Sequence, residues 1–261
     1  MRKYGVLEQL KAALAHPLTR HLAIDDPKTT GLRAEIIREK RFLRSIYQTW
    51  YTLLIDNLAA EDGPIVEIGS GAGFLKEVLL RAITSEVFYT AHVDMVLNAM
   101  RMPFKSCSLK TLLLVDTLHH IPDPASFFEE ATRCVQPGGQ CLMVEPWNTP
   151  WSRLIYKRLH HENFDACGGW TIPASGPLSG ANGAMPWILF ERDRSLFSER
   201  FPEWRISKIA MLMPVVYLLS GGVSLRNSFP GWSYPFFRKL ESFWEKRQQA
   251  GMFALIRLDR I

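Results

Sequence analysis

The chain has 261 residues, of which 47% are hydrophobic and 22% are charged, and its formal net charge is +5. These values are ordinary for a soluble globular protein, and the length suits one α/β domain with extensions better than two full domains. No dense Lys/Arg patch with interleaved aromatic residues occurs, so nucleic-acid binding is not expected. The mild basicity is compatible with an anionic partner or a membrane surface.

The cysteine and hydropathy patterns bear on the compartment of the protein. The four cysteines form no C-x-x-C pair, which argues against a zinc site and suggests reduced thiols. Residues 1–3 are followed by no continuous apolar segment, so we expect no signal peptide and a cytoplasmic location. The uncharged stretch between Lys208 and Arg226 nears the length of a membrane span, but Pro214 and the glycines behind it fit a buried strand and a turn better. We therefore expect no transmembrane span and leave peripheral membrane contact open.

Residues 1–60 are expected to form a helical cap ahead of the sheet. Apolar residues recur at three- and four-residue steps from Arg33 to Leu58, which predicts one long amphipathic helix. Its basic residues are expected on a solvated face: Arg38, Lys40, Arg41 and Arg44. The aromatic residues at 47–51 could fold over the neighbouring loop as a lid, although packing on the sheet is commoner for such residues.

A glycine-rich turn follows a short apolar strand predicted at 65–68. Gly69, Gly71 and Gly73 would let the backbone turn sharply and approach a ligand closely. The apolar spacing over 74–82 predicts a helix, whose first N–H groups would offer a polar cradle. This pattern is typical of a nucleotide-type site.

Two residues indicate which nucleotide the turn would bind. Phe74 stands where a dinucleotide-binding turn needs glycine or alanine, which argues against a nicotinamide-dependent dehydrogenase. Glu67 precedes the first glycine by two residues, and its carboxylate suits a positively charged ligand better than a pyrophosphate. The segment from Glu67 to Gly73 resembles the first motif of class I S-adenosylmethionine-dependent methyltransferases. The resemblance implies cofactor contacts from Glu67, Gly69, Ser70, Gly71 and Gly73.

Two further strands are predicted at 82–86 and 95–99. Glu86 has the spacing at which a carboxylate accepts hydrogen bonds from ribose hydroxyls; Asp94 is the competing candidate, which we interpret as a capping or turn residue. In the resembled family an Asp-Ala pair follows near the adenine, so the resemblance places Asn98 and Ala99 there. Asn98 can still donate and accept hydrogen bonds at an adenine edge.

The segment from 111 to 145 strengthens the resemblance. A buried strand ends in Asp116, Asp123 and a proline begin a helix, and a Pro-Gly-Gly turn leads to a strand at 140–145. This order closely resembles the methyltransferases called type 11, and with the glycine motif it covers residues 65–146. The resemblance implies a Rossmann-like, mostly parallel seven-stranded sheet with helices on both faces and an N-terminal helical extension, with Asp116 in the cofactor pocket.

The remaining chain is expected to complete a single domain. After the cofactor-binding half at 61–146, the Gly-, Ser- and Pro-rich residues 147–200 suit an insertion that covers the substrate. Residues 201–261 would supply a sixth strand with an apolar extension over 204–219, a helix at 236–244 and a final strand at 253–258.

Two histidine clusters are the candidates for acid–base chemistry. His119 and His120 can have a pKa near neutrality, but His120 could equally pack while His119 caps or binds cofactor. The second cluster, His160, His161 and Glu162, lacks the i, i+4 spacing of helical zinc ligands, so no metal is expected.

The sequence thus predicts an S-adenosylmethionine-dependent methyltransferase that acts on a small acceptor by direct displacement. Its aromatic-rich C-terminal half hints at a hydrophobic acceptor. A general base is needed only for a weakly acidic hydroxyl, thiol or activated carbon. The alternative is a non-catalytic binding or scaffold protein with the same fold.

Overall fold

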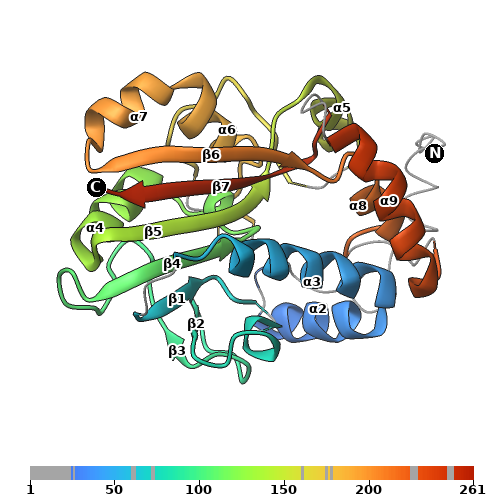
Figure 1. Cartoon of the computed structure of the whole chain (residues 1–261), viewed down its shortest axis with the longest axis horizontal. Coiled ribbons are helices and arrows are strands. Elements are labelled where there is room, and N and C mark those ends of the chain that lie inside the picture. Colours follow the sequence, from blue (N-terminus) through green and yellow to red (C-terminus); the bar gives the residue numbers. More distant parts are fainter. Residues whose placement is uncertain are drawn as a thin grey trace, which may run out of the picture.

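The computed structural model describes residues 25, 27–59, 63–71, 74–159, 162–173, 176, 179–223, 229–245 and 250–261. Seven strands form one sheet in the order β3-β2-β1-β4-β5-β7-β6 (Figure 1). The strands are β1 (Ile65–Ile68), β2 (Ile83–Glu86), β3 (Met95–Val96), β4 (Leu109–Val115), β5 (Val135–Pro146), β6 (Trp204–Leu212) and β7 (Phe253–Arg260). Only β7 runs antiparallel to its neighbours, which confirms the predicted fold class.

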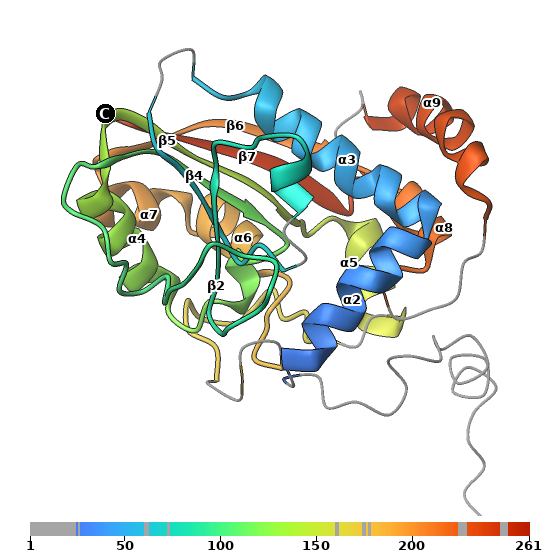
Figure 2. The ribbon, with the colours of Figure 1, turned by 90° about the horizontal axis from the view of Figure 1, so that it is seen from below.

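Helices cover both faces of this sheet. They are α2 (Pro27–Glu39), α3 (Arg41–Asp56), α4 (Pro124–Cys134), α5 (Pro150–Leu159), α6 (Met185–Trp187), α7 (Arg194–Arg200), α8 (Val216–Ser220) and α9 (Tyr234–Glu245). Shorter turns of helix are η1 (Phe74–Glu77), η2 (Leu118–His120), η3 (Ile188–Arg192) and η4 (Gly231–Ser233). Helix α3 lies on one face, and α4, α6 and α7 lie on the other (Figures 1 and 2).

Successive side chains of β4 point to opposite faces of the sheet and are apolar on both. All seven of its residues are buried. Leu112 and Leu114 belong to the cluster with α4 and α7, whereas Leu113 and Val115 belong to the cluster with α3. A parallel strand covered on both faces is expected to carry such a continuous apolar run.

The start of α4 confirms the helix predicted after the fourth strand. The side chain of Asp123 accepts hydrogen bonds from the N–H groups of Ala125 and Ser126, and Pro124 occupies the first helical position. These contacts satisfy donors that every helix leaves unpaired at its first turn. Helix α4 therefore begins at the residue that the sequence indicates.

The prediction of one long helix over 33–58 is wrong, because two helices meet at Lys40. This side chain is only 2% exposed, and its Nζ donates hydrogen bonds to the carbonyls of Ser220 and Gly222 at the end of α8. Its backbone leaves the helical region, with a ψ of 80°. The lysine expected on a solvated face thus joins the N-terminal helices to α8.

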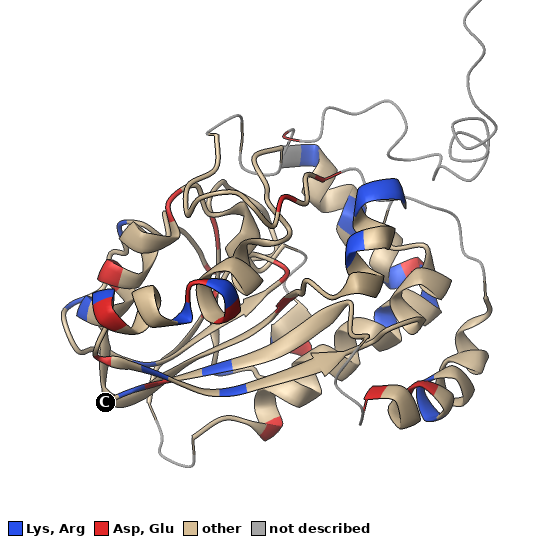
Figure 3. Ribbon diagram, turned by 90° about the horizontal axis from the view of Figure 1, so that it is seen from above, with Lys and Arg blue, Asp and Glu red and all other residues tan. Residues whose placement is uncertain are grey.

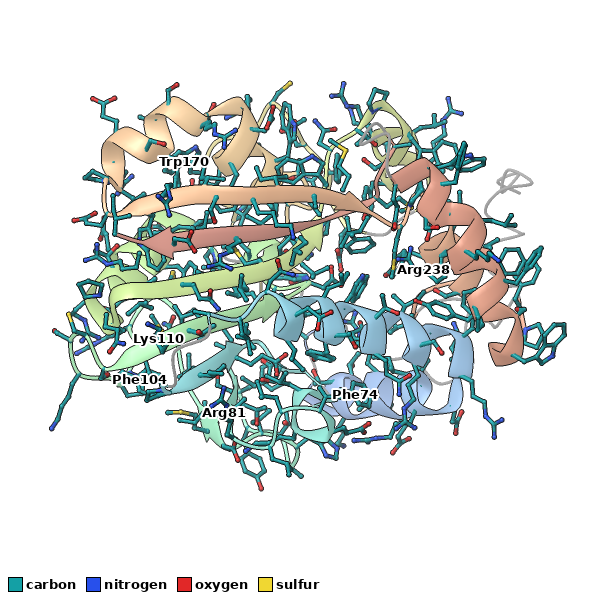
Figure 4. The ribbon with its side chains drawn as sticks, viewed as in Figure 1. Phe74, Arg81, Phe104, Lys110, Trp170 and Arg238 are labelled. Atoms are coloured by element: carbon teal, nitrogen blue, oxygen red, sulfur yellow. The ribbon has the colours of Figure 1, made fainter. Side chains whose placement is uncertain are left out.

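The segment after the glycine turn also differs from the prediction. Only Phe74–Glu77 is helical, as a single 3-10 turn, and Val78 is 47% exposed. Nine residues between the turn and β2 are too few for a stable helix without strong packing. Phe74 itself is buried beside α2, where the Arg38 guanidinium lies 5.2 Å from its ring centroid (Figure 4).

The apolar stretch after Lys208 is not a single extended strand. Strand β6 ends at Leu212, and the chain then forms α8, which closes with Gly221 in the left-handed conformation. None of the helices in the described ranges combines the length and apolar character that a membrane crossing requires. Residues 1–24 lie outside the described part of the chain.

Candidate functional site

The glycine turn lies between the ends of β1 and η1. Gly69 has a φ of +68°, and an added Cβ would lie 2.4 Å from a methyl carbon of Thr117. Gly71 has a φ of +51°, but an added Cβ there would have no atom of the described residues within 4 Å. Gly69 is therefore needed for packing, whereas Gly71 borders open space. Gly73 lies outside the described residues, and a four-residue η1 cannot supply the helix N-terminus that was expected.

Glu67 brings a buried carboxyl to the base of this turn. Its side chain is fully buried, and neither carboxylate oxygen makes a hydrogen bond of normal length and angle with any residue that the structure describes. Burial raises the pKa of Glu67 to about 7, although Ser70 and the Tyr51 hydroxyl are close enough to lower it. An uncompensated buried carboxyl is costly, so the site suits a ligand that brings a positive charge.

Glu86 connects the end of β2 to the same turn. Its Oε1 accepts a hydrogen bond from the Gly71 N–H at 2.9 Å, and its Oε2 accepts one from Val87 at 3.0 Å. Asp94 instead accepts hydrogen bonds from the N–H and hydroxyl of Thr84 and pairs with Lys76. The structure thus brings Glu86, and not Asp94, to the glycine turn.

Three other predicted cofactor residues have different surroundings. Ser70 is buried, and its hydroxyl accepts a hydrogen bond from the Ser85 N–H at 3.0 Å, which ties the turn to β2. Asn98 is exposed and its side-chain oxygen accepts from the Met100 N–H, while Ala99 is partly buried against the core. Strand β3 is only two residues long, so Asn98 and Ala99 lie in the loop that follows it.

The loop after β4 carries Asp116 and both candidate histidines. Asp116 has a positive φ of 55° and follows the last residue of β4. The Nδ1 of His119 lies 2.8 Å from Glu145 Oε2, and the other oxygen of Glu145 accepts hydrogen bonds from the N–H groups of Thr117 and Leu118. The buried Glu145 therefore fixes both the loop and the orientation of the His119 ring.

Glu162 lies opposite the two histidines. Its carboxylate is 3.5 Å from His119 Nε2 and 3.8 Å from His120 Nε2, and Asp116 Oδ1 is 3.9 Å from His119 Nε2. The Nδ1 of His120 lies 3.3 Å from the Gly180 carbonyl. His119, His120 and Glu162 each offer a ligand atom within 4.8 Å of the others. His160 and His161 lie outside the described residues.

The charged groups in this cluster shift one another's pKa values. Burial lowers the pKa of His119, but its contacts with Glu145 and Glu162 outweigh burial and raise the pKa well above its usual value. Burial and the charge on His119 lower the pKa of His120 to about 3. Burial raises the pKa of Asp116 to about 7, with His119 acting in the opposite direction. Only one of the two imidazoles therefore holds a second proton.

Sequence reasoning missed the aromatic wall of this cluster. Burial is the main cause that raises the pKa of three tyrosines, Tyr47, Tyr156 and Tyr217. The carboxylates of Asp116 and Glu162 raise these pKa values further. The charge of Arg33 on α2 acts in the opposite direction on the pKa of Tyr47 and Tyr217, and also lowers that of Asp116. The tyrosines come from α3, α5 and α8, which are far apart in sequence. Tyr47 belongs to the aromatic segment considered as a lid, but no local pattern indicates that the three tyrosines come together.

Comparison with known proteins gives a family match and a shared fold. Residues 66–143 match the family model described as a methyltransferase domain. No curated protein matched the chain in sequence.

Three solved structures are similar. A geranyl diphosphate methyltransferase in complex with SAM covers 93% of this chain and 95% of its own, with 14% identity and a TM-score of 0.52. A possible histamine N-methyltransferase from Thermotoga maritima covers 87% and 99%, with 18% identity and a TM-score of 0.50. The geranyl diphosphate C-methyltransferase of Streptomyces coelicolor A3(2) covers 95% and 90%, with 15% identity and a TM-score of 0.49. At these identities the likeness to the first two structures establishes the fold alone.

Proposed function

We propose that the chain is a class I S-adenosylmethionine-dependent methyltransferase that methylates a small, apolar acceptor by direct displacement; the methyltransferase-domain match over residues 66–143 and the shared fold support this. The observation that carries this proposal is the buried carboxyl of Glu67, which makes no hydrogen bond of normal length and angle to a described residue and lies beneath a glycine turn where Gly71 has no described neighbour on its open side. S-adenosylmethionine bears an ammonium and a sulfonium, and either charge would compensate this carboxyl.

The residues around the turn support a division of contacts with the cofactor. Glu86 accepts a hydrogen bond from the Gly71 N–H. It lies at the end of β2, the position from which a carboxylate binds ribose hydroxyls in nucleotide-binding folds of this kind. Asn98 and Ala99 would lie towards the adenine. Ser70 would act indirectly, since its hydroxyl holds the turn against β2.

The chain's own contribution to catalysis would be alignment and the exclusion of water. The bound cofactor supplies a methyl group on a sulfonium, whose departure needs no protonation. Holding acceptor and methyl in line supplies much of the rate acceleration of such a reaction. The His119–Glu145 pair and His120 lie beyond Asp116, at the end of β4, where they would contact the reacting group of the acceptor.

The aromatic surroundings support an apolar acceptor. Trp50 and Phe253 are fully buried, and Tyr217 packs on both, with ring centroids 6.0 Å and 4.7 Å away. Besides burial, the charges of Asp116 and Glu162 raise the pKa of the Tyr217 hydroxyl. A molecule with an apolar body and one ionisable group would match this combination.

The outer face of α9 supports peripheral membrane contact. Large apolar side chains recur there at helical spacing and are more than half exposed: Phe236, Leu240, Phe243 and Trp244, with Trp232 just before the helix. Both charge signs occur on α9 (Figures 3 and 4), but Arg238 pairs with Glu241 and Glu245 on the inner side, whereas Lys239 is exposed. Exposed aromatics beside a lysine are typical of a helix that lies in an anionic membrane surface.

Vesicle sedimentation tests this contact. We expect the protein to sediment with vesicles containing phosphatidylglycerol, and Phe236→Ser with Phe243→Ser to abolish this. Equal sedimentation of this double variant would contradict membrane contact. A cytoplasmic location, as the sequence suggests, would give α9 access to an anionic inner leaflet.

Calorimetry tests the proposed function itself. We expect S-adenosylmethionine and S-adenosylhomocysteine to bind wild-type protein, and Gly71→Asp to abolish binding because its carboxylate would occupy the open space at the turn. Lack of binding by folded wild-type protein would overturn the proposal. A scaffold protein would bind cofactor yet release no demethylated product with any of a panel of apolar phenols, thiols and lipids.

A further inference from the structure

The cluster beyond β4 has the composition of a metal site. We propose that His119, His120 and Glu162 bind one Zn²⁺ ion on the acceptor side of the crevice. The site stands on the geometry of these residues, and its role towards the acceptor rests on the proposed methyltransferase function. It departs from the sequence-based expectation of no metal, which considered only the local spacing of residues 160–162.

The first argument is that His119 is already oriented as a ligand. Its Nδ1 lies 2.8 Å from Glu145, a residue with no exposure, so in the neutral ring the Nδ1–H donates to Glu145 and Nε2 carries the lone pair that a metal would bind in place of the second proton. That Nε2 is buried and has no hydrogen-bond partner among the residues that the structure describes. Zinc-binding histidines commonly donate their second N–H to a carboxylate in this way.

The second argument is that His120 is oriented towards the same point. The Gly180 carbonyl can only accept, so the Nδ1 of His120 carries the proton and its Nε2 is also a lone-pair donor. The two rings lie 4.2 Å apart between centroids. Both Nε2 atoms approach the carboxylate of Glu162, each one a different oxygen.

The third argument is the spacing of the ligand atoms. Tetrahedral ligands about 2.0–2.2 Å from zinc lie about 3.4 Å from one another. The nitrogen–oxygen separations here are 3.5 Å and 3.8 Å, slightly longer than a hydrogen bond and close to that value. With both rings neutral, the two Nε2 lone pairs and the carboxylate form an electron-rich cluster that a cation between them would stabilise. A proton can satisfy one nitrogen, whereas a metal ion satisfies both together with the carboxylate.

The donor set favours zinc over magnesium. Imidazole nitrogens suit Zn²⁺, and Mg²⁺ prefers oxygen ligands with several waters. Three protein ligands would leave a fourth position, near Asp116 Oδ1, which is 3.9 Å from His119 Nε2. An anionic oxygen of the acceptor could occupy that position, since a catalytic zinc keeps one site open and lowers the pKa of the group bound there.

The test is titration of Zn²⁺ into tag-free, chelator-treated full-length protein, with Co²⁺ absorption as a second readout. We expect one equivalent to bind, and a Co²⁺ spectrum of nitrogen and oxygen ligands without a thiolate band. Glu145→Gln should weaken binding about 10- to 100-fold through loss of ring orientation. Glu162→Gln and His120→Gln should weaken it at least as much. The exposed residues His92 and Glu191 provide the matched controls His92→Gln and Glu191→Gln, which should bind as wild type does.

Two results would overturn the metal site. One is the absence of Zn²⁺ binding by wild-type protein that still binds S-adenosylhomocysteine, which leaves the proposed function intact. The other is unchanged Zn²⁺ affinity in both Glu162→Gln and His120→Gln. Zn²⁺ binding that depends on these residues in protein without cofactor affinity would support the site and contradict the methyltransferase proposal instead.

Discussion

The Glu67→Gln variant removes the charge of the buried carboxyl and keeps its shape. Burial raises the pKa of Glu67 from 4.5 to about 7 in the folded protein. Below pH 4.5 the group is protonated in both the folded and unfolded states. As the pH rises from about 4.5 to about 7, the folded protein loses about 3 kcal/mol of stability from this group, since the unfolded chain ionises more easily. Glutamine does not ionise, so the variant keeps this stability.

Thermal unfolding without cofactor at pH 5 and pH 8 measures this difference. The change in stability of the variant relative to wild type, taken between the two pH values, should be about 2–3 kcal/mol in favour of the variant at pH 8. This corresponds to a relative gain in Tm of about 4–6 °C for a chain of this size. Comparing the two pH values cancels the cost of burying an unpaired amide. Glu191→Gln, at an exposed position, should show no such dependence.

Cofactor binding should show the opposite trend in the same variant. Glu67→Gln should lower the affinity for S-adenosylmethionine, because the amide does not compensate its positive charge. For wild type the affinity should fall below pH 7, by up to tenfold per pH unit, since the carboxyl must first lose its proton. Calorimetry between pH 5.5 and pH 8 measures this. A variant that binds as tightly as wild type, with no gain in Tm at pH 8, would refute the role of Glu67.

Two further predictions concern other parts of the fold. Gly69→Ala should cost more than about 2 kcal/mol, from its positive φ and the clash with Thr117, whereas Gly71→Ala should cost only about 1–2 kcal/mol and mainly weaken cofactor binding. Denaturant unfolding with calorimetry separates the two, and equal stability losses would contradict the distinction. Lys40→Met should lower the stability by about 1–3 kcal/mol, because two carbonyls at the end of α8 lose their hydrogen-bond donor. The control Lys105→Met, at an exposed position, should change the stability little. Unchanged stability of Lys40→Met would show that this link is not stabilising.

Local signals were sufficient for the central part of the fold. The apolar runs predicted β1, β4 and the core of β5, and the Asp123-Pro124 pair predicted the start of α4. Each of these signals acts within a few residues of the chain. The same applies to Glu86, whose spacing from the glycine turn placed it at the end of β2.

The errors arose where a distant contact overrides local periodicity. Lys40 lies in an amphipathic pattern, and only the carbonyls of residues 180 positions later explain why its helix is broken. Glu162 lies 43 and 42 residues after the two histidines that it faces, a proximity set by the topology and not by spacing. The aromatic wall from α3, α5 and α8 likewise depends on packing that a sequence pattern does not encode.

A crystal structure of the chain with S-adenosylhomocysteine tests the central claim most directly. We predict that the ribose hydroxyls lie within hydrogen-bond distance of Glu86, and that the amino-acid portion lies over the turn at Gly69 and Gly71, with its ammonium on the side of Glu67. A ligand that contacts neither Glu67 nor Glu86, or that lies away from the ends of β1 and β2, would contradict this placement.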